Sequence, residues 1–143
     1  MKILCFFIIF YSAFLNAKEL PIFYFEPQES IIVGTLEIQT FPGAPGYESI
    51  ANGDAIESCW YLRLAKPVNV LVRQDRKNKI DNNSTSTFNV KIIQLVIMDE
   101  PLLFKKLLIK NKKVTATGTL FSSFTGHHHA RVLMEVHNIV ESR

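Results

Sequence analysis

Cysteine is scarce in this chain, which limits how the fold can be cross-linked. The 143 residues include only two cysteines, Cys5 and Cys59. Cys5 lies in an apolar N-terminal run of the kind that is removed on export, which would leave Cys59 without a partner for a disulfide within the chain. A lone cysteine in an oxidising compartment is most often a small buried side chain. We therefore expect Cys59 to be buried, with a disulfide between molecules as the alternative.

The sequence also lacks the spaced motifs that mark the common catalytic and metal sites. It has no Gly-x-Ser-x-Gly nucleophile elbow and no glycine-rich phosphate loop before a helix. It has neither a His-Glu-x-x-His motif nor the cysteine spacing of a zinc ribbon. These absences exclude the enzyme classes that such motifs identify, so no reaction can be assigned from a motif.

The chain also lacks a large excess of positive or negative charge. The chain has 16 Lys and Arg against 13 Asp and Glu, a formal net charge of +3. This weak positive balance disfavours a dedicated nucleic-acid binder. With 48% hydrophobic and 20% charged residues, the composition is that of a globular protein rather than a disordered one. The length suits one domain with its own core.

The one long apolar run of the chain lies at its N-terminus. It covers residues 3–15, after Met1-Lys2 and before Asn16-Ala17. These 13 residues are too few to cross a bilayer about 30 Å thick as a helix. The pattern predicts a secretory signal peptide over residues 1–17, with an uncleaved anchor as the alternative. We expect a periplasmic or secreted protein with no stable membrane span after cleavage.

Five stretches alternate between apolar and polar residues, the pattern typical of strands. They cover residues 31–41, 60–65 with 68–72 resuming the same strand, 88–98, 112–121 and 130–139. A short helix is predicted over residues 99–110, because an acidic start with an early proline precedes leucines at helical spacing. The polar residues 73–87 are predicted to form a mobile hairpin loop.

This order of elements predicts the fold. Three strands, a helix and two strands is the order of the OB-fold, a five-stranded Greek-key barrel. Gly34 and Gly118 suit the sharp bends of such strands. We predict an all-β domain with one short helix and an OB-like barrel over residues 31–143, preceded by a lead-in over residues 18–30. The alternative is an open antiparallel α+β sheet or sandwich.

The OB-like fold would bring two distant loops together at a candidate binding rim. Loops one-to-two and four-to-five flank the binding surface of OB-folds, and here they are residues 42–58 and 122–128. The first is rich in acids, and three consecutive histidines lie in and just after the second. The predicted rim residues are Tyr47, Glu48, Asp54, Glu57, His127, His128 and His129.

The three histidines also suggest a metal site. Strand alternation would put His127 and His129 on one face and His128 on the other. A third ligand would then come from an acid of the neighbouring loop, for which we choose Glu48. Two histidines and one carboxylate suit a divalent metal such as zinc. The alternatives are exposed loop histidines, a His–carboxylate clasp between the loops, or a ligand site without metal.

Several of these segments resemble a known family. They are residues 40–54, with Phe-Pro-Gly and Tyr-Glu-Ser, and residues 61–64, 114–121 and 125–129. Together they resemble a bacterial family called domain of unknown function 4431, over roughly residues 34–136. Members of that family look like exported proteins of Gram-negative bacteria, which implies the periplasm or beyond. The family has no established activity to carry over.

The sequence therefore favours an exported OB-like binding domain of unknown ligand. Its rim would recognise a small ligand, a glycan or a protein partner. The alternative is a metal-dependent hydrolase that uses the same histidines and carboxylates. Nucleic acid is disfavoured by export, by the weak net charge and by the acids of the rim.

Overall fold

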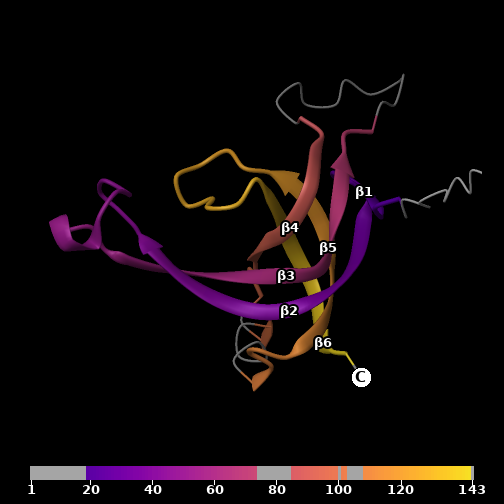
Figure 1. Cartoon of the computed structure of the whole chain (residues 1–143). Helices are drawn as coiled ribbons and strands as arrows, with labels where there is room; N and C mark the ends of the chain where they lie inside the picture. Colours follow the sequence, from indigo (N-terminus) through magenta and orange to yellow (C-terminus); the bar gives the residue numbers. More distant parts are fainter. Residues whose placement is uncertain (1–18, 74–84, 100, 103–107, 143) are drawn as a thin grey trace, which may run out of the picture.

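Strands make up most of the chain in its computed structural model (Figure 1), which describes residues 19–73, 85–99, 101–102 and 108–142. The described strands are β1 (Ile22–Tyr24), β2 (Glu29–Pro42), β3 (Ile56–Leu71), β4 (Thr87–Val96), β5 (Lys113–Ser122) and β6 (Val132–Glu141). A single 3-10 turn, η1 (Ile50–Asn52), lies between β2 and β3. The prediction of a nearly all-β chain is confirmed.

The strands form one mixed sheet in the order β1-β3-β2-β5-β6-β4, with a further pairing between β3 and β4. Because of that pairing, each of β2 to β6 has a hydrogen-bonded neighbour on both sides. The pairs β2–β3, β2–β5, β3–β4 and β5–β6 are antiparallel, whereas β4–β6 is parallel. The sheet is therefore mixed, since β4 and β6 run in the same direction where they meet.

The five predicted strands correspond to β2 through β6, and β1 is an addition. The short β1 pairs in parallel with the end of β3, in the segment predicted to be a lead-in. Phe25, directly after β1, is 3% exposed and belongs to the core. A strand of three residues carries too little alternation to be seen in the sequence.

Three sequence predictions fall wholly or partly outside the described residues. The signal peptide, residues 1–17, lies outside them, as do residues 74–84 of the predicted polar loop. Of the predicted helix, residues 101–102 and 108 are helical, and residues 100 and 103–107 lie outside the described part. Among the residues that are described, no helix is long and apolar enough to cross a membrane.

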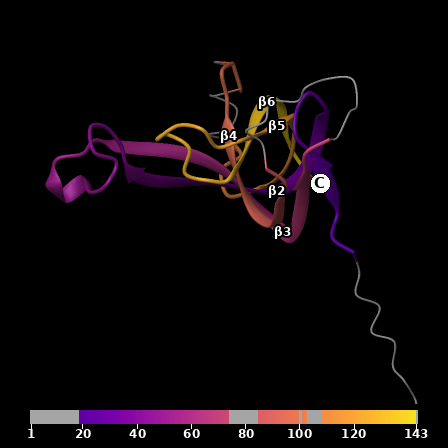
Figure 2. The same cartoon turned by 90° about the horizontal axis from the view of Figure 1, so that it is seen from above.

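The second half of β2 and the first half of β3 extend beyond the other strands as a curved two-stranded arm (Figures 1 and 2). At Gly34 the backbones of β2 and β3 come close together, because a Cβ there would lie 2.6 Å from the Arg63 carbonyl oxygen. Pro67 is tolerated within β3 because the pairing with β4 is interrupted between Arg63 and Val68, so its missing N–H breaks no regular ladder. The arm carries the loop between β2 and β3 at its far end.

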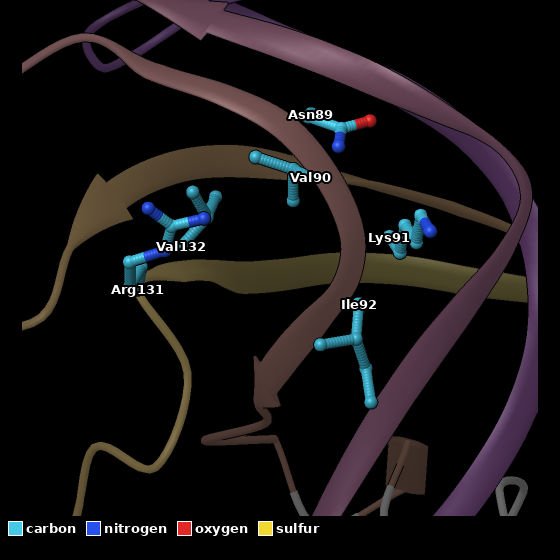
Figure 3. Close-up of a pocket in the computed structure, with 6 residues that line it drawn as sticks. All are labelled: Asn89, Val90, Lys91, Ile92, Arg131 and Val132. Carbon is cyan, nitrogen blue, oxygen red and sulfur yellow. The ribbon is translucent and has the colours of Figure 1, made fainter.

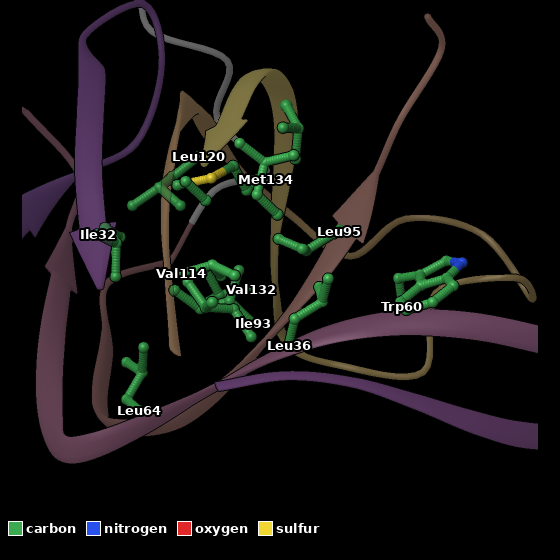
Figure 4. Close-up of a cluster of buried hydrophobic side chains, with 14 of the residues drawn as sticks. Ile32, Leu36, Trp60, Leu64, Ile93, Leu95, Val114, Leu120, Val132 and Met134 are labelled. Atoms are coloured by element: carbon green, nitrogen blue, oxygen red, sulfur yellow. The ribbon is translucent and has the colours of Figure 1, made fainter. Parts of the chain in front are cut away.

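The core lies on the inner face of the strands (Figure 4). Trp60, Leu62 and Leu64 of β3 alternate into it, as predicted from the sequence. Tyr61, however, is only 1% exposed although it points to the opposite face. The outer face of β3 is therefore covered at this position, where the ring of Phe41 lies 5.8 Å from that of Tyr61.

Candidate functional site

Two loops meet over the outer face of the sheet. The arm loop, residues 43–55, joins β2 to β3, and the histidine loop, residues 123–131, joins β5 to β6. Figures 1 and 2 both draw the histidine loop beside the arm. We call their contact region the junction, defined by Tyr47, Glu57, His127 and His129.

A buried glutamine holds the backbone of the histidine loop. Gln94 of β4 is 5% exposed and is paired across the strands with Tyr61. Its Nε2 donates to the carbonyl of His127 at 2.8 Å, and its Oε1 accepts from the N–H of His129 at 2.7 Å. One side chain thus fixes the backbone on both sides of His128.

Asp54 folds the arm loop from within. Its carboxylate accepts hydrogen bonds from the backbone N–H groups of Gly46, Glu48 and Ser49, each at 2.8 Å. These three bonds hold the pKa of the Asp54 carboxyl below its ordinary value, because they favour the ionised form. Asp54 therefore shapes the loop, and its oxygens are engaged away from the histidines.

His127 joins the two loops through both nitrogens of its ring. Its Nδ1 lies 2.9 Å from Glu57 Oε1, and its Nε2 lies 3.0 Å from the Tyr47 hydroxyl. An ionised carboxylate can only accept a hydrogen bond, so Nδ1 donates to Glu57, and Nε2 is hydrogen-bonded to the Tyr47 hydroxyl. The side chain of His127 is nevertheless 59% exposed. The contact fixes the ring while leaving it open to solvent.

His129 lies deeper in the junction. Its ring stacks on Phe41 with centroids 4.1 Å apart and planes inclined by 4°, and its side chain is 14% exposed. Its Nε2 lies 3.7 Å from Glu57 Oε2, and neither atom has a hydrogen-bond partner. The separation is too long for a hydrogen bond. Glu57 thus contacts His127 with one oxygen and faces His129 with the other.

Cys59 and Tyr61 lie beside Glu57 on the same face of β3, because residues two apart in a strand point the same way. The prediction that Cys59 is buried is confirmed, at 7% exposure. Burial, followed by the charge of Glu57, raises the pKa of the Cys59 thiol to about 11. Burial also raises the pKa of Tyr61, whose hydroxyl has no hydrogen-bond partner.

His128 turns away from the junction. Its Nδ1 accepts from the N–H of Phe124 at 3.1 Å, and its ring packs edge-on against Phe121 and Phe124. Partial burial, and then the neighbouring His127 and His129, lower the pKa of His128. The two-against-one division expected from alternation is present, although the histidines lie in the loop before β6 rather than in the strand.

The structure brings together only some of the predicted rim residues. Tyr47, Glu57, His127 and His129 meet in the junction. Asp54 is bonded within its own loop, and His128 points elsewhere. Glu48, chosen as the metal ligand, is exposed, and its carboxylate forms no hydrogen bond or ion pair with the described residues. The described group whose ligand atoms lie close enough for one ion is Glu57, Cys59 and His129.

Comparison with known proteins gives one match. Residues 92–140 match the family model of a domain of unknown function, DUF4431. Neither a curated protein nor a solved structure matches the chain. The resemblance is thus found over a shorter range than the expected residues 34–136.

The segment similar to DUF4431 contains one side of the junction. It includes Gln94 and the whole histidine loop, whereas Glu57 and Cys59 precede it. Four residues of the junction and its base were missed by sequence reasoning as site residues. These are Phe41, Cys59, Tyr61 and Gln94. A signal for two of them was present, because Glu57-x-Cys59-x-Tyr61 puts three polar or ligating groups on one strand face.

A separate pocket of about 340 Å³ lies between β4 and the start of β6 (Figure 3). It is lined by Asn89, Val90, Lys91, Ile92, Arg131 and Val132. None of the predicted rim residues lines it, and none of its lining groups is a buried polar atom without a partner. The junction therefore stays the stronger candidate site.

Proposed function

We propose that this protein is an exported binding domain with an OB-like barrel, and that the junction is its binding site. The closed series of pairings β2-β3-β4-β6-β5-β2 supports the barrel, because the five strands then leave no free edge over their paired lengths. The loops that meet at the junction are the two that flank the binding surface in OB-folds. The N-terminal signal-peptide pattern supports a periplasmic or secreted location.

The main support for this proposal is that the ring of His127 is held in place and also exposed. Its ring is held by hydrogen bonds from residues 70 and 80 positions away in the sequence, yet more than half of its side chain is exposed. Such a ring is fixed before any ligand arrives, so little conformational entropy is lost on binding.

The two loops and the arm favour a protein partner over a small ligand. Ile50 and Ile56 on the arm are 42% and 68% exposed, and Phe124 of the histidine loop is 76% exposed. Exposed aliphatic and aromatic side chains on the segments that carry a candidate site are typical of protein interfaces. A glycan would rely more on hydrogen bonding and ring stacking, and a small ligand would need a deeper cavity.

The test compares two exposed histidines. His127→Ala removes the fixed ring of the junction, whereas His137→Ala removes a histidine of β6 that pairs with Glu29 at 3.0 Å outside it. The mature protein is tested against purified envelope proteins, a glycan array and a small-molecule panel. We expect one binder, about tenfold or more weaker with His127→Ala and unchanged with His137→Ala.

Circular dichroism spectra of both variants should match the wild type. Binding that responds equally to the two substitutions would refute the junction as the site. A glycan or small-molecule binder that depends on His127 would keep the site and overturn the preference for a protein.

A further inference from the structure

We propose that the base of the junction is a metal site, in which Glu57 Oε2, Cys59 Sγ and His129 Nε2 bind one zinc-like ion. One carboxylate oxygen of Glu57, the Cys59 sulfur and one ring nitrogen of His129 lie within 4.8 Å of one another. They come from β3 and the histidine loop, so the site exists only when the two are packed together. This inference rests on the proposed function only in that both use Glu57. The inferred ion lies beneath the exposed His127, whereas the proposed protein partner would bind at the surface above it.

The distances suit a shared ion better than direct contact. Zinc binds nitrogen and oxygen at about 2.0–2.2 Å and sulfur at about 2.3 Å, so two ligands at a tetrahedral angle lie about 3.4–3.6 Å apart. The separation of Glu57 Oε2 and His129 Nε2 is 3.7 Å. The Cys59 sulfur lies 3.9 Å from the other oxygen of Glu57. Because all three ligand atoms lie within 4.8 Å of one another, movements of about 1 Å would complete the site.

Several buried polar atoms of this region lack a hydrogen-bond partner, and a bound ion would satisfy them. Glu57 Oε2, His129 Nε2 and the Tyr61 hydroxyl are all buried without a hydrogen-bond partner. Buried polar groups in folded proteins are nearly always paired, so three together call for an explanation. Tyr61 is 1% exposed, on the face of β3 that carries Glu57 and Cys59. Its ring lies 5.8 Å from the ring of Phe41, on which His129 stacks. One ion would satisfy two of the three atoms, Glu57 Oε2 and His129 Nε2.

The surrounding contacts hold the ligands in place. His127 Nδ1 bonds Glu57 Oε1, which orients the second oxygen of that carboxylate. Stacking on Phe41 fixes the plane of the His129 ring, and Gln94 bonds the His129 backbone. Outer contacts of this kind are typical of metal sites, where they orient the ligands.

The ligand set selects the class of metal. A thiolate and an imidazole favour zinc or a neighbouring late transition metal over calcium and magnesium, which prefer oxygen alone. On binding, the Cys59 thiol releases its proton to solvent and His129 binds as the neutral imidazole. Three protein ligands leave a fourth position open, which is the arrangement that the hydrolase alternative would also need.

The test uses the untagged mature protein after treatment with a chelator. Zinc binding is measured by competition with a chromophoric chelator, and cobalt is used as the spectroscopic stand-in. We expect one equivalent of zinc and a near-ultraviolet thiolate-to-cobalt band. Cys59→Ala and His129→Ala should each weaken zinc binding by more than about 100-fold, beyond the 10–100-fold of outer contacts. His137→Ala should leave zinc binding unchanged.

A measurement on the wild type covers the case in which a ligand variant fails to fold. Bound zinc should protect Cys59 from alkylation, and removal of zinc should restore its reactivity. Less than about a tenth of an equivalent of zinc, a cobalt complex without the thiolate band, or alkylation that ignores zinc would each overturn the proposal. His127→Ala separates the two proposals, since it should weaken partner binding about tenfold or more while the thiolate band stays.

Discussion

The buried side chain of Gln94 offers the sharpest test of how the histidine loop is held. Gln94→Leu keeps a similar volume but leaves the His127 carbonyl and the His129 N–H without their partner. An orphaned buried group costs about 1–3 kcal/mol, and less where water can reach it. Gln94 itself is 5% exposed, while the loop is only partly buried. Taking the lower end for each of the two groups, we expect the free energy of unfolding to fall by about 2 kcal/mol.

Equilibrium unfolding in urea measures this difference, provided that the slope with denaturant is unchanged. Gln28→Leu is the matched control, because exposed Gln28 accepts a single hydrogen bond from Arg73, and its effect should stay within about 0.5 kcal/mol. The His129 amide should also exchange with solvent faster in Gln94→Leu. If Gln94→Leu were as stable as the control, with the His129 amide still protected, the assignment of Gln94 as the anchor of the loop would be wrong.

Three further predictions concern individual residues. Gly118→Ala should destabilise the fold by about 1–3 kcal/mol or more in urea unfolding, because its Cβ would overlap the Glu135 carbonyl; an unchanged midpoint would contradict this. The Asp54 carboxyl has a lowered pKa in the folded state, so its contribution to stability is present above its ordinary pKa of about 4 and is lost as the pH falls through the lowered value. The amide resonances of Gly46 and Ser49 should shift over that acid range in the wild type and not in Asp54→Asn. Tyr61→Phe should leave the metal-free protein equally or more stable, because the hydroxyl that it removes has no partner, and a loss above about 1 kcal/mol would reveal a bond that stabilises the fold.

The strands were predictable because apolar and polar side chains alternate along them, and this pattern can be read from a few consecutive residues. Trp60, Leu62 and Leu64 identify β3 without any knowledge of its neighbours. The parallel meeting of β4 and β6 was not predictable, since pairing direction depends on how the whole sheet closes. Neither was β1, whose three residues are held by a partner about 45 positions away in the sequence.

The sequence predicted that two loops would meet at the candidate site, but not which of their residues would form it. Glu48 and Glu57 are equivalent as carboxylates in the sequence. The backbone separates them, because Tyr47 adopts a left-handed conformation with φ of 59° and Asp54 binds the loop from inside. Tyr47 consequently reaches His127, while Glu48 faces solvent. Of the two acids, only Glu57 lies in a regular strand, so strand alternation could have predicted that its side chain points the same way as that of Cys59.

The position of β1 limits where the proposed signal peptide could be cleaved without damage to the sheet. The strand begins at Ile22, and the carbonyl of Pro21 already accepts a hydrogen bond from Asn69. The predicted signal peptide ends at residue 17, so only a few residues separate the cleavage point from the first paired residue. A peptidase that cut five or more residues later would remove part of β1 and loosen Phe25 from the core. If the chain is exported as proposed, mass spectrometry of the mature protein should therefore find its N-terminus before Pro21.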